Sequence, residues 1–142
     1  MLALDLALAL RHAGLRWAPQ LGDRFVLPGR GMDEDVFVLS NMTVEVHEFP
    51  SGKVIGFNGV TEWALDAVDQ QEALWLPAEH QLRELLGGLF VSLEAGAAGF
   101  AVTLELPSGP AVYRASTAED AYGQALLAVL REVSGSLEST VR

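Results

Sequence analysis

The sequence predicts an α+β fold in which antiparallel sheet segments carry helices on one face. In each half of the chain, apolar and polar residues alternate next to a turn, which is typical of β-hairpins. Elsewhere apolar residues recur every three or four positions, as on the buried face of a helix. The length of 142 residues suits one domain, and the last nine residues are serine-rich without sustained periodicity. We therefore expect a single α+β domain over residues 1–133 and a flexible tail over residues 134–142.

Composition excludes several classes of function. Nineteen acidic and nine Lys or Arg residues leave a net charge of −10, whereas nucleic-acid binding needs a basic face. The absence of cysteine excludes thiol catalysis, iron–sulfur clusters, cysteine zinc sites and disulfides. No cofactor and no nucleic acid are expected.

The first helix is expected over residues 2–13, because leucine and alanine are strong helix formers and Gly14 can end the helix. Its leucines form two apolar stripes instead of one. Such a wide apolar surface is typical of a helix covered on two sides, by the core and by a second copy in a homodimer. Its leucines fall on two stripes, one with Leu2, Leu6 and Leu10 and the other with Leu4, Leu8 and Leu15.

The same leucine-rich segment does not read as a secretion signal. It contains Asp5, no positive charge precedes it, and no small-residue cleavage site follows it. It is also about half as long as a membrane-spanning helix. We therefore expect a cytoplasmic protein that does not interact with membranes.

The next part of the chain predicts a small antiparallel sheet. Residues 43–49 alternate so that one strand face is polar, and a Pro-Ser-Gly-Lys turn at residues 50–53 leads to a returning strand. The expected strands cover residues 25–27 (an edge or first strand, closed by Pro28), 36–39, 43–49 and 54–57.

From residue 61 the period becomes helical. Thr61 can cap a helix that runs to about Gln70, and an extended apolar segment follows at residues 73–76. Residues 82–93 are leucine-rich at helical spacing, with two adjacent glycines at 87–88. At these glycines either another element approaches closely or the helix breaks.

The last third predicts a hairpin followed by an amphipathic helix. Residues 100–106 alternate with one apolar face, residues 107–110 form the turn, and residues 111–115 return. Thr117 and Asp120 have capping-box spacing at the start of the helix. An apolar stripe then extends over four turns.

Familiar catalytic motifs are absent from the sequence, including the phosphate-binding loop, the G-x-S-x-G turn and H-E-x-x-H. One weak candidate is the pair Glu45 and His47, two residues apart on the same strand face. A carboxylate and an imidazole can bind a divalent metal or act as a general base. The plainer interpretation is two polar residues on the solvent face of a sheet.

Charge gives the stronger candidate site. Between Lys53 and Arg83 the chain has five acidic residues and no basic residue. Glu62, Asp66 and Asp69 are spaced i, i+4, i+7, so they share one face of the expected helix. That face is either simply solvated or a docking face for a basic partner, whose association it would accelerate.

Three strings of the sequence stand out: Gly14-Leu15-Arg16-Trp17, Gly22-Asp23-Arg24-Phe25 and Leu74-Trp75-Leu76-Pro77. They resemble strings of small uncharacterised bacterial and phage proteins, and the resemblance covers most of the chain. A narrower bacterial subset, some of whose members carry an automatic pilus-assembly label, is similar over Thr43 to Asp66. The resemblance implies no established activity. Any role in pilus assembly would be non-catalytic, because the nucleotide-binding loop of an ATPase is missing.

We expect a non-catalytic interaction module of the cytoplasm with an acidic docking face at Glu62, Asp66 and Asp69. One alternative is a small metal-dependent enzyme or sensor that uses Glu45 and His47. A second alternative is a phage-derived protein with a structural or packing role.

Overall fold

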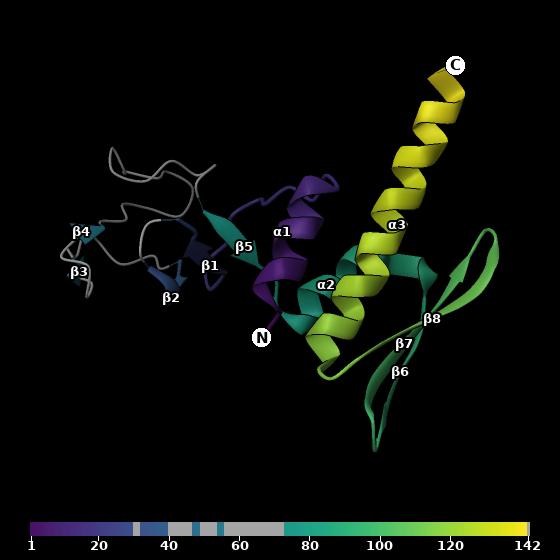
Figure 1. Ribbon diagram of the computed structural model, residues 1–142, viewed down its shortest axis with the longest axis horizontal. Coiled ribbons are helices and arrows are strands. Elements are labelled where there is room, and N and C mark those ends of the chain that lie inside the picture. Colours follow the sequence, from purple (N-terminus) through teal and green to yellow (C-terminus); the bar gives the residue numbers. More distant parts are fainter. Residues whose placement is uncertain (30–31, 40–46, 49–53, 56–72, 142) are drawn as a thin grey trace. The chain divides into compact units, whose positions relative to one another are not determined.

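A computed structural model describes residues 1–29, 32–39, 47–48, 54–55 and 73–141 (Figure 1). Helices and antiparallel sheets are both present, which confirms the predicted α+β class. In chain order the elements are α1 (Leu4–His12), β1 (Arg24–Leu27), β2 (Met32–Val38), β3 (His47–Glu48), β4 (Val54–Ile55), β5 (Leu74–Leu76), α2 (Glu79–Leu86), the 3-10 turn η2 (Gly87–Leu89), β6 (Phe90–Gly96), β7 (Gly99–Leu106), β8 (Gly109–Ala115) and α3 (Ala118–Val141).

The chain divides into two compact units. Unit 1 consists of Met1–Arg16 together with Pro77–Arg142, and unit 2 consists of Trp17–Leu76. Unit 2 is thus inserted in the sequence between α1 and α2 of unit 1. The expected single domain over residues 1–133 spans both units and stays a prediction.

The sheet of unit 1 has the order β6-β7-β8 and is antiparallel throughout. Two-residue turns join the strands, because Gly96 pairs with Gly99 and Leu106 pairs with Gly109. Gly99 and Gly109 have φ angles of 124° and 123°, a backbone region that glycine adopts without steric cost. The predicted C-terminal hairpin is therefore confirmed, with each strand starting one or two residues earlier than expected.

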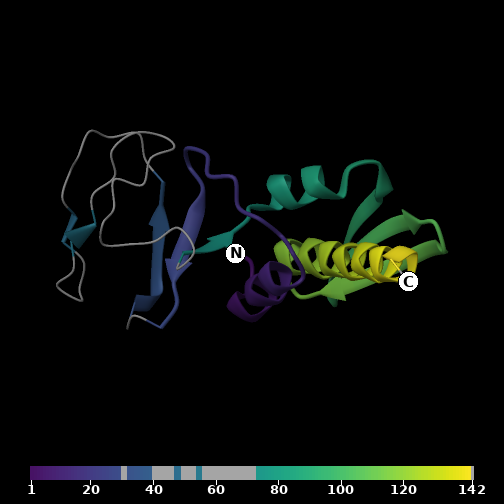
Figure 2. The same cartoon turned by 90° about the horizontal axis from the view of Figure 1, so that it is seen from above.

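Helix α3 covers one face of this sheet, and Figure 2 shows it lying along the strands. The alternating residues Val102 and Leu104 of β7 are fully buried under it. On α3 the buried side chains include Ala121, Tyr122 and Ala125, which belong to the predicted apolar stripe. The helix runs to Val141 and so includes most of the segment expected to be a flexible tail, whose flexibility stays a prediction.

The predicted helix over residues 82–93 is wrong in its second half. Helix α2 ends at Leu86, η2 follows, and strand β6 begins at Phe90. Gly87 has a φ angle of 56°, and no atom outside its immediate neighbours lies within 4 Å of the place a Cβ would occupy. Of the two expected explanations for the adjacent glycines, helix breakage is therefore the one observed.

Helix α1 forms close to its predicted range and packs on α3. Gly14 follows it with a φ angle of 111°, as expected of a glycine that ends a helix. A Cβ built on Gly123 of α3 would lie 2.7 Å from Leu6 Cδ2 and 2.8 Å from Leu2 Cδ1. The stripe with Leu2 and Leu6 is therefore the one that faces the core, while Leu4 on the other stripe is exposed.

Unit 2 contains a three-stranded antiparallel sheet with the order β2-β1-β5. The expected edge position of β1 is wrong, because this strand pairs on both sides; it is nevertheless the first strand in the chain. The extended segment predicted at residues 73–76 is β5, in which Trp75 pairs with Phe25. Strands β3 and β4 form the separate expected hairpin, with His47 opposite Ile55.

Aromatic rings cluster in unit 2 around the buried side chains of Phe25 and Phe37. Phe25 lies 5.4 Å from Trp17 and 5.5 Å from Phe37, measured between ring centroids. Trp17 and Trp75 are nearly parallel, with 6.5 Å between centroids and 11° between planes. The buried Nε1 of Trp75 has no hydrogen-bond partner among the residues that the structure describes.

Candidate functional site

The predicted acidic face cannot be placed on the fold. Glu62, Asp66 and Asp69 lie outside the described residues, which pass from 55 to 73. The acidic docking face therefore stays a prediction.

The predicted metal pair lies in the same part of the chain. Glu45 is outside the described residues, and His47 contributes only its backbone, as the first residue of β3. Within the described ranges, no group of three or more His, Asp or Glu side chains is placed to hold a metal ion. The role of Glu45 and His47 also stays a prediction.

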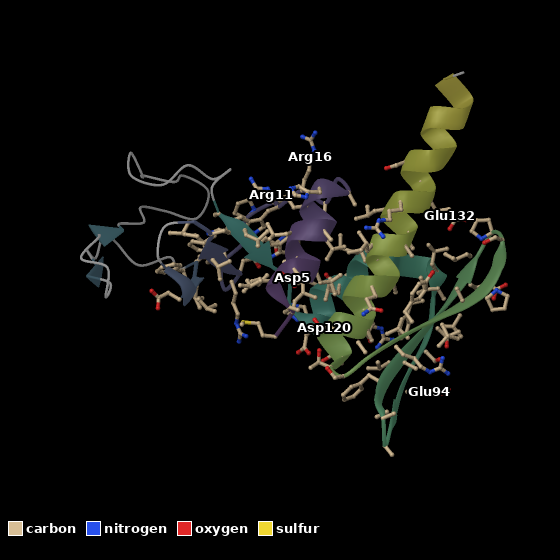
Figure 3. All side chains as sticks on the ribbon, viewed as in Figure 1. Asp5, Arg11, Arg16, Glu94, Asp120 and Glu132 are labelled. Carbon is tan, nitrogen blue, oxygen red and sulfur yellow. The ribbon has the colours of Figure 1, made fainter. Side chains whose placement is uncertain are left out.

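What the structure does place is a shallow groove in unit 1, between α1, the end of β8 and the first turns of α3. Its volume is about 430 Å³. Figure 3 shows Asp5 on α1 and Asp120 on α3 near this groove. The lining residues are Ala3, Asp5, Leu6, Ala9, Ala115, Ser116, Asp120 and Gln124.

Small side chains create this groove. Alanine at three of the lining positions removes bulk from the facing surfaces of α1 and β8, while Gly123 brings α1 close to α3. The lining is thus mostly apolar and includes a few polar groups, which is the general character of a ligand site in proteins.

Asp120 holds the two helices in position. Its Oδ1 accepts a hydrogen bond of 2.8 Å from the backbone N–H of Ala3, just before α1 begins. Its own N–H donates to Thr117 Oγ1 at 3.2 Å, which confirms one half of the predicted capping box. In the other half of a capping box the Asp120 carboxylate would accept from the backbone N–H of Thr117. Here it accepts from the backbone N–H of Ala3, just before α1. Asp120 thus has a structural task, whereas Asp5 is exposed.

The groove is suited to binding a cationic group. Two carboxylates, one amide and one hydroxyl line it, and a positive charge would be attracted to the carboxylates. None of the lining residues is a histidine that could activate Ser116 as a nucleophile. The lining therefore offers charged and polar groups that can recognise a cationic ligand.

A second polar cluster joins α2, β6 and α3. The Arg83 guanidinium lies 4.4 Å above the ring of Phe90, which in turn stacks on Tyr122 at 5.7 Å between centroids. Burial raises the pKa of the Tyr122 hydroxyl above its ordinary value of 10.0. The charge of Arg83 and its hydrogen bond to this hydroxyl act in the opposite direction, while the charge of Glu79 adds to the increase.

In unit 2, Asp23 is the acidic residue that sequence reasoning missed. Its side chain is only 4% exposed. Oδ2 accepts hydrogen bonds from Trp17 Nε1 at 2.8 Å and from the Gln20 N–H at 2.9 Å. The carboxylate thus fixes the turn before β1, and the nearby turn residues at 20–22 were the signal available in the sequence.

Comparison of the chain with known protein families, curated proteins and solved structures found no match. No helix in the described ranges is both long and apolar enough to cross a membrane.

Proposed function

We propose that the protein is a non-catalytic interaction module that docks a basic partner through its acidic surfaces. The observation that supports this function best is the groove of unit 1, whose mostly apolar lining includes Asp5 and Asp120. The net charge of −10 and the base-free stretch between Lys53 and Arg83 support it independently. Long-range attraction would accelerate association with a basic partner and make it sensitive to salt.

The proposed place of action is the cytoplasm. The apolar opening segment supports this, because it folds as α1, and its Leu2 and Leu10 are buried in unit 1. A homodimer through α1 would use the opposite stripe, on which Leu4 is exposed. Metal-dependent chemistry at Glu45 and His47, a phage-derived structural role and a non-catalytic part in pilus assembly have no described contact in their favour.

Pull-down experiments with matched charge variants test the proposal. The first variant combines Glu62→Gln, Asp66→Asn and Asp69→Asn, and the second is Asp5→Asn in the groove. If acidic docking is the function, at least one of the two loses partners that the wild type captures at low salt.

A control variant has to keep those partners. It combines Glu79→Gln, Glu84→Gln and Glu132→Gln, which removes three exposed charges elsewhere on unit 1. Identical partner lists for all four proteins would contradict the proposal. Equal losses in the control and the first variant would show that only total charge matters.

A further inference from the structure

One face of the unit 1 sheet is covered by no helix of the described part of the chain. Side chains alternate along a strand, and Val102 and Leu104 of β7 are buried under α3. The residues that alternate with them, Ala101, Thr103 and Glu105, therefore point away from α3. On the strands beside β7 this outer face exposes two valines, Val91 at 56% and Val112 at 46%. Isolated exposed valines are ordinary on a protein surface, and what distinguishes this face is the placement of its charges.

The outer face carries opposite charges on its two outer strands. In one row across the sheet, Glu94 of β6 pairs with Ala101 of β7, and Ala101 pairs with Arg114 of β8. Glu94 and Arg114 are both exposed, and their backbones are about 10 Å apart across Ala101. Within the described part of the chain neither has an ion-pair partner. Figure 3 shows Glu94 on β6.

We propose that this outer face binds the same face of a second copy, about a two-fold axis parallel to β7. Rotation about such an axis places β6 of one copy over β8 of the other and keeps the position along the strands. Each Glu94 then lies opposite Arg114 of the second copy, which gives two symmetric ion pairs. A self-complementary surface of this kind is what a two-fold dimer requires.

The same rotation also brings the exposed valines together. Val112 shares its row with Thr103 and Ser92, and Val91 precedes Ser92 at the irregularity in β6. Val112 of one copy therefore lies over the Val91 and Ser92 region of the other. Along the axis itself the small side chains of Ala101 and Thr103 let the two sheets approach to the usual spacing of about 10 Å.

One residue opposes the association. Glu105 lies on β7, close to the axis, in the row of Pro110 at one end of the sheet. In the dimer it faces Glu105 of the second copy. The face is also small, roughly 25 Å by 14 Å from standard strand dimensions. We therefore expect a weak, concentration-dependent dimer.

Charge reversal in sedimentation velocity, with the full-length chain, tests this arrangement. Glu94→Arg or Arg114→Glu alone places like charges in both symmetric pairs and should weaken self-association roughly tenfold or more. The double variant should recover it. An equimolar mixture of the two single variants should also dimerise, because each pair in the mixed dimer again joins opposite charges.

Glu105→Gln provides a control of opposite sign. It removes one negative charge, as Glu94→Gln does, but it should strengthen the dimer while Glu94→Gln weakens it. Leu4→Lys, on the exposed stripe of α1, should leave the dimer intact. Circular dichroism verifies that each exposed substitution keeps the fold.

Three outcomes would overturn the proposal. The first is a monomer at every concentration up to about 500 µM, which would leave the face to a different partner. The second is a mixture of the single variants that fails to dimerise. The third is a dimer that Leu4→Lys dissociates and Glu94→Arg does not, which would place the interface on α1.

Discussion

At the scale of single residues, two glycines of the C-terminal hairpin have nearly the same backbone and very different surroundings. A Cβ on Gly99 would lie 2.5 Å from the carbonyl oxygen of Ala115, whereas none of the surrounding atoms would lie within 4 Å of a Cβ on Gly109. Their φ angles differ by only about a degree, so any other residue has a disfavoured positive φ at both positions. Comparing the same substitution at Gly99 and at Gly109 therefore distinguishes the energetic cost of steric overlap from that of backbone strain.

We expect Gly109→Ala to lower the free energy of unfolding by about 1–3 kcal/mol through backbone strain alone. Gly99→Ala should cost roughly 2 kcal/mol more, because the backbone of Ala115 has to move. Chemical denaturation of both variants measures the difference. Equal losses would show that the close approach at Gly99 has no energetic consequence.

Tyr122 should make stability depend on alkaline pH. Its pKa is raised in the folded state, chiefly by burial, so the unfolded chain loses this proton first as the pH increases. The contribution is complete below about pH 10 and is lost as the pH rises through the folded-state pKa. We expect the free energy of unfolding of the wild type to fall more steeply than that of Tyr122→Phe as the pH rises above about 10.

The second tyrosine provides the control for this experiment. Tyr113→Phe removes a half-buried phenol from β8 and should keep the steep fall, since Tyr122 remains. Parallel slopes for the wild type and Tyr122→Phe would show that this hydroxyl titrates alike in both states. Ultraviolet absorbance of the phenolate gives an independent measurement.

At the scale of elements, the docking of α1 on α3 depends on the missing side chain of Gly123. The tips of Leu2 and Leu6 occupy the place of its Cβ, so a large side chain has to displace α1. Gly123→Leu improves helix propensity by nearly 1 kcal/mol, which makes any loss of stability attributable to packing. We expect a net loss of about 1–3 kcal/mol and faster amide hydrogen exchange in α1 than in β7.

Glu132→Leu is the matched control, because it adds the same side chain at an exposed position of α3. It should change stability by less than about 0.5 kcal/mol and leave exchange in α1 unaltered. If Gly123→Leu left α1 as protected as in the wild type, the close contact would not be what holds this helix.

At the scale of the whole molecule, the sequence predicts best where periodicity and turn chemistry agree. The last hairpin and α3 are such a case, since alternation in β7 ends at a turn and Thr117 caps the helix. The stretch after Leu86 is a counterexample. Its apolar residues fit a helical spacing, yet adjacent glycines end α2 and let Phe90 enter a strand beside β7. Local backbone cost outweighed the apolar pattern there.

The groove of unit 1 was not predicted from the sequence, for a different reason. Asp5 and Asp120 are far apart in the sequence, and their neighbours in the lining are mostly alanines, which form no recognisable motif. Only the packing of α1 on α3, set by Gly123, brings them together. The acidic stretch between Lys53 and Arg83 could be recognised because its signal is local. The partners of Glu62, Asp66 and Asp69 are decided by tertiary structure, which a pattern along the chain does not contain.

The stacking of Trp17 on Trp75 has a consequence for how the chain reaches its fold. Trp17 and Trp75 come from the beginning and the end of the unit 2 sequence, yet their rings stack on each other. Strands β1 and β5 pair next to them. For unit 1, everything from residue 17 to residue 76 is one loop of about 60 residues that has to close before α1 can meet α3. Closing a flexible loop of that length costs about 3 kcal/mol more than closing one of two residues. When unit 2 folds first, its own aromatic contact has already brought the two ends together, and unit 1 assembles as though its halves were joined by a short link.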